Sequence, residues 1–477
     1  MANDEKRRTA DGDDAGMDEA VLAAAALALL VASTSFMNTA VFPLFDPIFT
    51  HARDFSVSAT ALALMALGFV AYRAPRLLTP ASFTAGTFAF LAAGAGVMLA
   101  GLIFSHPATL TLGACLVGVG RAGATVLTGL ALARLRLRFV ALGISAAYGL
   151  QLATGVLAGA VPAAVGVGAF LLCPVAAAAL TERPARIVLE HSHGREAPHD
   201  LAVTRPSSFL SPFSTLFVCL LLFHVAFGFA LRFDEVGGVP RASALEALPA
   251  LAVGAWVLLT RRPFPADLLA QVSALIVIAG FFLASDGSAS FTRGAVTLLS
   301  AGNSLFDMTA WMALVAIAER NPLGAATTIA WGRGLSSLGS VLGAAAGTGV
   351  NHAIGADGHL VFLVVGTLML VFAAYALIGL KRFTFTGAIE GIQPVGEHDA
   401  ATSPAERLEA RCGELAAEFG LTPREAEVFA MLARGRNREY IEEALVVSRN
   451  TVKAHVKHIY AKLGIHSHQE LIDLVER

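Results

Sequence analysis

The sequence SRNTVKAHVKHIYAKLG, residues 448–464, predicts a helix with one buried face and one polar, cationic face. Ser448 is a residue type that caps helix N-termini, and Gly464 is one that ends helices. At about 100° per residue, four apolar side chains share one face: Val452, Val456, Ile459 and Leu463. The other face and its flanks carry small, polar or cationic side chains: Asn450, Thr451, Lys453, Ala454, Lys457, His458 and Ala461.

The polar face has the composition of a helix that enters a DNA major groove. Ala454 lies between Lys453 and Lys457, and a small residue there lets the helix approach base edges while the ammonium groups reach acceptors. Cations are concentrated around it, with Arg434, Arg436, Arg438, Arg449, Lys453, Lys457 and Lys462 against Glu439, Glu442 and Glu443. This local excess suits phosphate contact. The alternative, an amphipathic helix of an ordinary small bundle, leaves the exposed cations unexplained.

The flanking sequence predicts three more helices. LTPREAEVFAMLARG, residues 421–435, opens with a capping box formed by Thr422 and Glu425 and stops at Gly435. A second helix is expected at about 438–445 and a last one at about 468–476.

Over residues 421–477 these motifs resemble the LuxR-type helix-turn-helix domains, close to the NarL/FixJ kind. The resemblance implies that Lys453, Ala454 and Lys457 face bases and that Thr451 and His455 approach phosphate. Asn450 and Arg438 complete the set of expected DNA-binding residues. The resemblance also implies double-stranded DNA as a partner and a homodimer formed through the last helix, by residues such as Leu471 and Leu474. Glu442 departs from the family, which has a small residue at that position.

The rest of the chain is far more apolar. It has 56% hydrophobic and 15% charged residues with a mean hydropathy of +0.66, and spans of about 20 apolar residues mark membrane helices. We predict twelve spans near 20–42, 57–72, 81–104, 108–132, 139–160, 162–181, 209–231, 243–260, 266–285, 293–318, 325–350 and 359–380. The predicted fold is therefore all-α, with the lipid bilayer as a partner.

Six spans, a long loop at 182–208 and six more spans resemble the layout of the major facilitator superfamily. The domains expected are a disordered tail at 1–19, a transmembrane sensor domain at 20–382, a linker at 383–403, an amphipathic helix at 404–420 and the DNA-binding domain at 421–477. Duplicated halves of this kind place binding sites near the midplane between them.

The Lys and Arg residues outside the spans set the expected orientation. With the N-terminus inside, the cytoplasmic side would hold Lys6, Arg7, Arg8, Arg73, Arg76, Arg134, Arg136, Arg138, Arg183, Arg186, Arg195, Arg205, Arg261, Arg262, Arg320, Lys381 and Arg382. The outer side would hold only Arg53, Arg232, Arg241 and Arg293. The sequence therefore predicts a multi-pass protein of the cell membrane with both termini in the cytoplasm.

Polar groups within the spans are candidates for sensing, because charges are costly there. Arg121, Asp307 and Arg333 lie in otherwise apolar spans, and Asn303 and Gln151 are expected to border the same cavity. An arginine in such a place favours a small polar ligand with a carboxylate or hydroxyl group. The alternative is a structural Asp307–Arg333 ion pair, and the two interpretations are compatible.

No nucleophile–base arrangement, phosphate-binding loop or metal-ligand motif is present in the sequence, so we expect no enzyme, cofactor or metal site. The histidines of EHSHGREAPHD, residues 190–200, lack helical ligand spacing. Two functions remain: a membrane-embedded transcriptional regulator that senses a small molecule, or a transporter with a regulatory DNA-binding tail. The loop FVAYRAPRLLTPAS, residues 69–82, lacks the acidic residue of the usual facilitator motif, and this absence weakens the transporter hypothesis. A simple membrane anchor would need only one span.

Overall fold

The computed structural model describes residues 2–193, 197–199, 202, 208–211, 214–233, 247–260, 265–284, 289–354, 358–393, 404–436, 438–445 and 447–476, with the side chains of most of these residues from Met17 onward. The described residues are helices and turns, without a strand. They divide into two compact units, residues 1–394 and 395–477. Both units are helical, as the sequence predicts.

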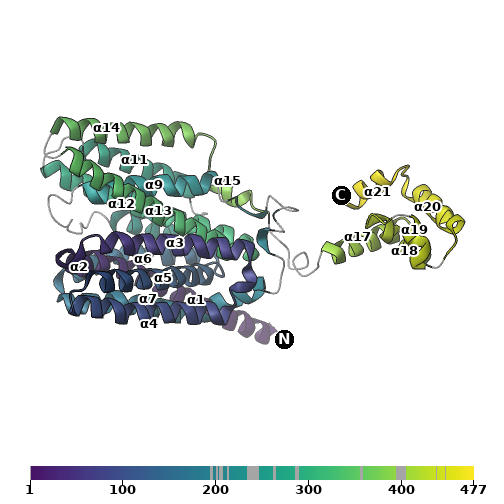
Figure 1. Cartoon of the computed structure of the whole chain (residues 1–477), viewed down its shortest axis with the longest axis horizontal. Coiled ribbons are helices and arrows are strands. Elements are labelled where there is room, and N and C mark those ends of the chain that lie inside the picture. The colour runs from purple at the N-terminus through teal and green to yellow at the C-terminus, as the bar shows by residue number, and fades with distance from the viewer. Residues whose placement is uncertain are drawn as a thin grey trace. The chain divides into compact units, whose positions relative to one another are not determined.

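The first half of the larger unit comprises α1 Ala2–Phe36, η1 Met37–Val41, α2 Phe42–Phe49, α3 Ala52–Arg73, η2 Pro75–Leu77, α4 Pro80–Ile103, α5 Pro107–Leu132, α6 Leu137–Ala160 and α7 Ala163–His193 (Figure 1). The second half comprises α9 Thr215–Phe233, α10 Leu248–Leu259, α11 Ala266–Ala284, α12 Ala289–Arg320, η6 Pro322–Gly324, α13 Ala325–Ile354, α14 Gly358–Ala374, η7 Tyr375–Gly379 and α15 Phe385–Glu390. Every predicted span falls largely on one of these helical segments.

Nine helices of the described part are long and apolar enough to cross a membrane. The helices α9 and α10 are apolar but shorter, and α13 is long but less apolar because it carries Arg333 and several glycines and serines. Together these twelve segments form the two six-helix halves of a multi-pass membrane protein.

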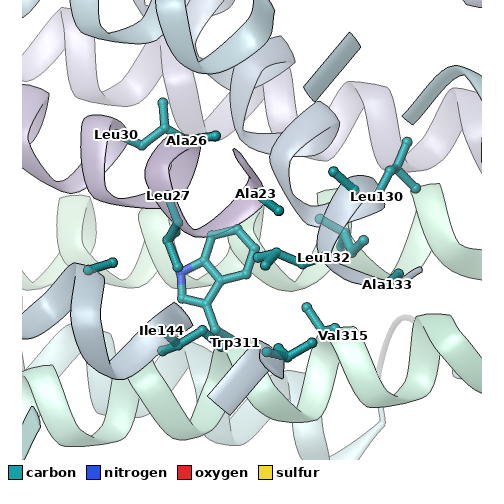
Figure 2. Close-up of a cluster of buried hydrophobic side chains, with 14 of the residues drawn as sticks. Ala23, Ala26, Leu27, Leu30, Leu130, Leu132, Ala133, Ile144, Trp311 and Val315 are labelled. Atoms are coloured by element: carbon teal, nitrogen blue, oxygen red, sulfur yellow. The ribbon is translucent and has the colours of Figure 1, made fainter. Parts of the chain in front are cut away.

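The two halves pack through several helices, including α3 against α13 and α6 against α10 and α12. Trp311 of α12 is 2% exposed and lies among Leu27 of α1, Leu132 of α5 and Ile144 of α6 (Figure 2). Within the second half, α9 and α13 approach closely, since a Cβ on Gly339 would lie 2.3 Å from the Leu221 carbonyl oxygen. A side chain larger than hydrogen is therefore excluded there, and α13 is held against the helix that carries His224.

The smaller unit comprises α17 Pro404–Glu418, α18 Pro423–Ala433, α19 Arg438–Leu445, α20 Arg449–Leu463 and α21 His468–Glu476. Its core includes Cys412, Leu415, Phe429, Val456 and Leu471. The predicted amphipathic helix is thus α17, and it packs on the domain that follows it in sequence.

Helical residues occur in three segments that were expected to lie outside the spans. The helix α1 begins at Ala2, within the segment 1–19 that was expected to be a disordered tail. The predicted 182–208 loop starts later, since α7 continues to His193 with Ala185 and Leu189 buried; much of the remaining loop lies outside the described residues. The predicted 383–403 linker contains α15, because Phe385 and Ile392 are buried in the core of the second half.

Candidate DNA interface and intramembrane polar site

The helix α20 is fixed at both ends by the residues that the sequence predicted. The Ser448 hydroxyl oxygen accepts a hydrogen bond from the Thr451 backbone N–H at 3.2 Å, and Gly464 ends the helix with φ of +67°. An L-residue with a side chain rarely adopts that φ, which explains the glycine. The apolar face is buried, with Val452 and Ile459 fully inaccessible.

The opposite face of α20 is free for contact. Five of the expected DNA-binding residues have exposed side chains: Asn450, Thr451, Lys453, Ala454 and Lys457. His455 is half-buried, and Arg438 begins α19 with a side chain outside the described residues. Lys453 and Lys457 also border a shallow groove of about 560 Å³ whose walls include Tyr460 and His466. The face therefore presents two ammonium groups on either side of a methyl group.

Lys462 has a different role from the other cations of α20. Its Nζ lies 2.7 Å from Glu425 Oε2 and donates to the Gly420 carbonyl oxygen at 2.9 Å. Glu425 is the residue that closes the capping box of α18 by accepting from the Thr422 N–H at 2.8 Å. These hydrogen bonds, from Lys462 first and then from the Thr422 backbone, lower the pKa of Glu425 to about 2. One carboxylate thus caps α18 and holds the end of α20, a link that local sequence patterns did not reveal.

Glu442, the departure from the family pattern, is half-buried in α19. Within the described part of the chain, its Oε1 is buried without a hydrogen-bond partner. Such an atom costs stability, but α19 still forms with Ile441 fully buried.

In the larger unit, Asp307 of α12 is the centre of a buried polar cluster. Arg333 of α13 donates to both carboxylate oxygens, to Oδ1 from Nη1 and to Oδ2 from Nη2 at 3.3 Å. Tyr148 of α6 donates its hydroxyl proton to Oδ2. His224 of α9 places Nε2 at 3.3 Å from Oδ1 and donates from Nδ1 to the Leu220 carbonyl oxygen at 2.8 Å.

This cluster joins four helices and both halves. Asp307 is 8% and His224 5% exposed, so the charges are screened little by water. The Arg333 guanidinium also lies over the Trp311 ring, 4.7 Å from its centroid, which holds it against the seam between the halves. The predicted Asp307–Arg333 pair is present, whereas Tyr148 was missed because a tyrosine in an apolar span carries no distinctive sequence signal.

Arg121 of α5 has a different set of described contacts from the Asp307 cluster. Its Nη2 donates to the Thr34 hydroxyl at 2.9 Å and its Nη1 to the Met37 sulfur at 3.0 Å, and its guanidinium lies 5.2 Å from the Phe170 ring centroid. Among the described residues no carboxylate pairs with it. Its described neighbours are thus a hydroxyl, a thioether and a π face, with the Cys173 thiol close enough to interact electrostatically.

The other two predicted polar residues, Asn303 and Gln151, lie on the helices that carry Asp307 and Tyr148. Asn303 precedes Asp307 by one turn of α12, and in the described structure its Oδ1 is buried without a hydrogen-bond partner. Gln151 is half-buried on α6, one turn beyond Tyr148, and the described contacts join it to neither group. Both side chains are near the cluster in sequence without bonding to it.

A second ion pair also links the halves and was not expected. Arg232 of α9 donates to Asp54 Oδ1 of α3 at 2.5 Å, and Arg232 is only 7% exposed. Both residues lie just outside the predicted spans 57–72 and 209–231, where charges are common and carry little information. Among the described residues, no group of three or more His, Cys, Asp or Glu side chains is arranged to hold a metal ion.

The geometry defines a helix-turn-helix DNA-binding domain joined to a membrane helix bundle. Residues 420–475 match the family model GerE, bacterial regulatory proteins of the luxR family. They are 45% identical over 56 residues to the Fimbriae Z protein of Salmonella typhimurium, a match covering 12% of this chain and 27% of that protein. They are 43% identical over 53 residues to the oxygen regulatory protein NreC of Staphylococcus aureus, covering 11% and 24%. The C-terminal domain is a LuxR-type helix-turn-helix domain, and the chain spans only about a quarter of either relative.

The membrane unit is similar in fold to solved major facilitator structures. The human organic anion transporter MFSD10 matches with a TM-score of 0.53 at 14% identity, covering 75% of this chain and 99% of that one. A double-tryptophan variant of XylE matches with a TM-score of 0.53 at 10% identity, covering 79% and 99%. At such identities the likeness shows the fold alone. The chain therefore combines a LuxR-type DNA-binding domain with a major-facilitator-like membrane fold.

Proposed function

We propose that this protein is a membrane-embedded one-component transcriptional regulator, in which the membrane unit senses a small molecule and the C-terminal domain binds promoter DNA. The observation that carries the proposal is that one chain joins a LuxR-type domain with an exposed Lys453–Ala454–Lys457 face to a membrane unit with a buried polar cluster between its halves. No catalytic step, cofactor or metal is part of this function.

The DNA-binding step uses the free face of α20. Lys453, Ala454 and Lys457 would face base edges, and Asn450, Thr451, His455 and Arg438 would lie nearer the backbone. One such helix contacts the bases of about one half-site of an operator. We therefore propose that the regulator binds as a homodimer to a DNA site with twofold symmetry. Leu471, which was expected to take part in pairing, is fully buried in the core of its own domain. The proposed pairing surface is therefore the α21 face with Leu474, which is only partly buried.

The sensing step would use two separate groups. Arg121 is proposed to receive an anionic or hydroxyl-bearing group, because among the described residues it contacts Thr34, Met37 and Phe170 and pairs with no carboxylate. The Asp307 cluster is proposed to be the switch, since it joins Tyr148 in one half to His224 and Arg333 in the other. A ligand shifts such an equilibrium only if it binds one arrangement better.

We further propose that the protein lies in the cell membrane with both termini in the cytoplasm. The Lys and Arg bias supports this orientation, and it places α20 in the compartment that contains DNA.

The test combines transcript profiling with a promoter reporter. Loss of the gene should change a defined set of transcripts, and the change should depend on one of the candidate metabolites supplied. Restoring the chain with Lys453→Ala and Lys457→Ala should restore membrane protein but not regulation.

The second candidate is a transporter with a regulatory DNA-binding tail, which the facilitator-like fold favours. Cells with the intact protein would then accumulate a radiolabelled form of the inducing metabolite faster than cells without it, even when residues 404–477 are removed. Equal uptake with lost regulation would reject the transporter and support the regulator.

A further inference from the structure

The short helix α15 is held in place by a side chain from α11. Asp267 at the start of α11 accepts hydrogen bonds through Oδ1 from the Phe385 N–H at 2.5 Å and the Thr386 N–H at 3.4 Å. The Thr384 hydroxyl accepts from the Gly387 N–H at 3.0 Å. Six residues are too few to form a stable helix in water, so α15 depends on these caps and on what it packs against. Its position on the second half is seen in Figure 1.

The Phe385 side chain inserts into the core beside the residues that hold the polar cluster. It is 2% exposed, and its ring meets the Phe306 ring edge to face with centroids 6.1 Å apart. Phe306 in turn stacks on Phe223 at 3.8 Å. Phe306 directly precedes Asp307, and Phe223 directly precedes His224. The aromatic stack under Phe385 is therefore built from the same turns of α12 and α9 that form the cluster.

The other end of α15 is held by the same helix α12. Arg320, its last residue, donates from Nη1 to the carbonyl oxygens of Glu390 at 3.3 Å and Ile392 at 3.4 Å. Ile392 is 5% exposed. Phe306 and Arg320 thus place both ends of the 385–392 segment on α12, the helix that carries Asp307.

From these contacts we propose that α15 is a latch that reports the state of the Asp307 cluster to the DNA-binding domain. This inference rests on the proposed function. When the hydrogen bonds of the Asp307 cluster are intact, the Phe306 and Phe223 rings stay in the positions against which Phe385 packs. The 385–392 segment then stays docked on α12. A ligand that reorganises Asp307 and His224 shifts the Phe306 and Phe223 rings. The packing site for the Phe385 ring is then lost, and the segment undocks. Closely packed aromatic groups switch between discrete arrangements, so a small displacement suffices.

The first experiment measures docking directly, by hydrogen exchange of the purified full chain in detergent without added metabolite. The double variant Asp307→Asn with Arg333→Gln should speed exchange of the Phe385–Gly391 amides by at least about fivefold, the lower range of an allosteric coupling. Asp267→Ala should do the same by removing the cap. Unchanged exchange in the Asp307 variant, with α15 still responsive to Asp267→Ala, would overturn the coupling.

The second experiment measures output from a promoter reporter, normalised to the amount of protein in the membrane. Phe385→Ala and Asp267→Ala should shift normalised output in the same direction by about fivefold or more and remove the response to metabolite. Phe45→Ala is the matched control, because this equally buried phenylalanine of α2 packs on Phe42 in a separate hydrophobic cluster of the first half. It should lower abundance without changing output per molecule.

The outcomes separate the latch from the function beneath it. If Lys453→Ala abolishes regulation while the Phe385 and Asp267 variants respond like the parent chain, the latch is rejected and the regulator stands. If Lys453→Ala has no effect on any promoter, the proposed function fails first. A Phe45→Ala variant with the same altered output as Phe385→Ala would also reject the latch, because general loosening of the core would then explain both.

Discussion

At the scale of single residues, Lys453 and Lys457 differ from Lys462 although all three lie on α20. Lys453→Ala or Lys457→Ala should weaken specific DNA binding by about 1–3 kcal/mol and relax sequence preference, if each contacts a base. Gel-shift titration of residues 404–477, weak as a monomer and tighter when artificially dimerised, checks this. Lys462→Ala is the control: it breaks the Glu425 pair and should lower thermal stability while keeping sequence preference. Unchanged affinity in both test variants would contradict the assignment of the reading face.

Glu425 gives the same domain a defined pH dependence. Its folded-state pKa of about 2 lies below the ordinary value of 4.5, so the carboxylate adds stability at pH above about 4.5. That contribution is lost as the pH falls through the window from about 4.5 to about 2. Glu425→Gln should lower stability at neutral pH by about 1–2 kcal/mol, discounted because the Lys462 side chain is 35% exposed. Denaturant unfolding at several pH values measures it, and the difference between variant and parent should shrink toward pH 2.

At the scale of elements, the Asp307–Arg333 pair ties α12 to α13. Arg333→Ala leaves a buried carboxylate with fewer partners and should cost several kcal/mol, seen as lower abundance in the membrane. The double change Asp307→Asn with Arg333→Gln removes both charges and should recover abundance while losing the response to metabolite. Arg121→Ala should lose the response at normal abundance, because that side chain lies in no ion pair among the described residues. Normal response in all three proteins would exclude these groups from sensing.

The same scale shows what could be predicted from sequence. The helices of the smaller unit followed from local signals, with Ser448, Thr422 and Gly464 fixing ends and Val452 and Val456 fixing the buried face. The membrane spans followed from apolar length. The Tyr148–Asp307 and Asp54–Arg232 hydrogen bonds could not be predicted from the sequence. Each joins residues more than 100 positions apart and depends on how the halves pack. The helix α15 was missed because it lies in the stretch 383–403 that was expected to be a linker, whereas a carboxylate from α11 caps it.

At the scale of the whole molecule, orientation is the property to measure. Ser105, exposed between α4 and α5, should lie outside, and Arg136, exposed between α5 and α6, should lie inside. In intact cells a membrane-impermeant thiol reagent should label Ser105→Cys above the parent chain and should label Arg136→Cys only after the membrane is opened. The parent chain, with its own four cysteines, is the baseline. The reverse pattern would place the DNA-binding domain away from DNA and would refute the proposed topology.

Docking of α15 also sets the length of the tether on which the DNA-binding domain is carried. From Ile392, the last residue held by Arg320, to Pro404, where α17 begins, the chain can extend at most about 40 Å, at roughly 3.5 Å per residue. If the segment undocked back to Leu380, the limit would be about 80 Å. For two domains anchored in one membrane, effective concentration falls roughly as the −3/2 power of tether length, or about threefold for a doubling. With α15 docked, the short tether would favour dimerisation of two DNA-binding domains close to the bilayer. With α15 released, the local concentration of the domains would fall, but each domain could contact DNA farther from the membrane.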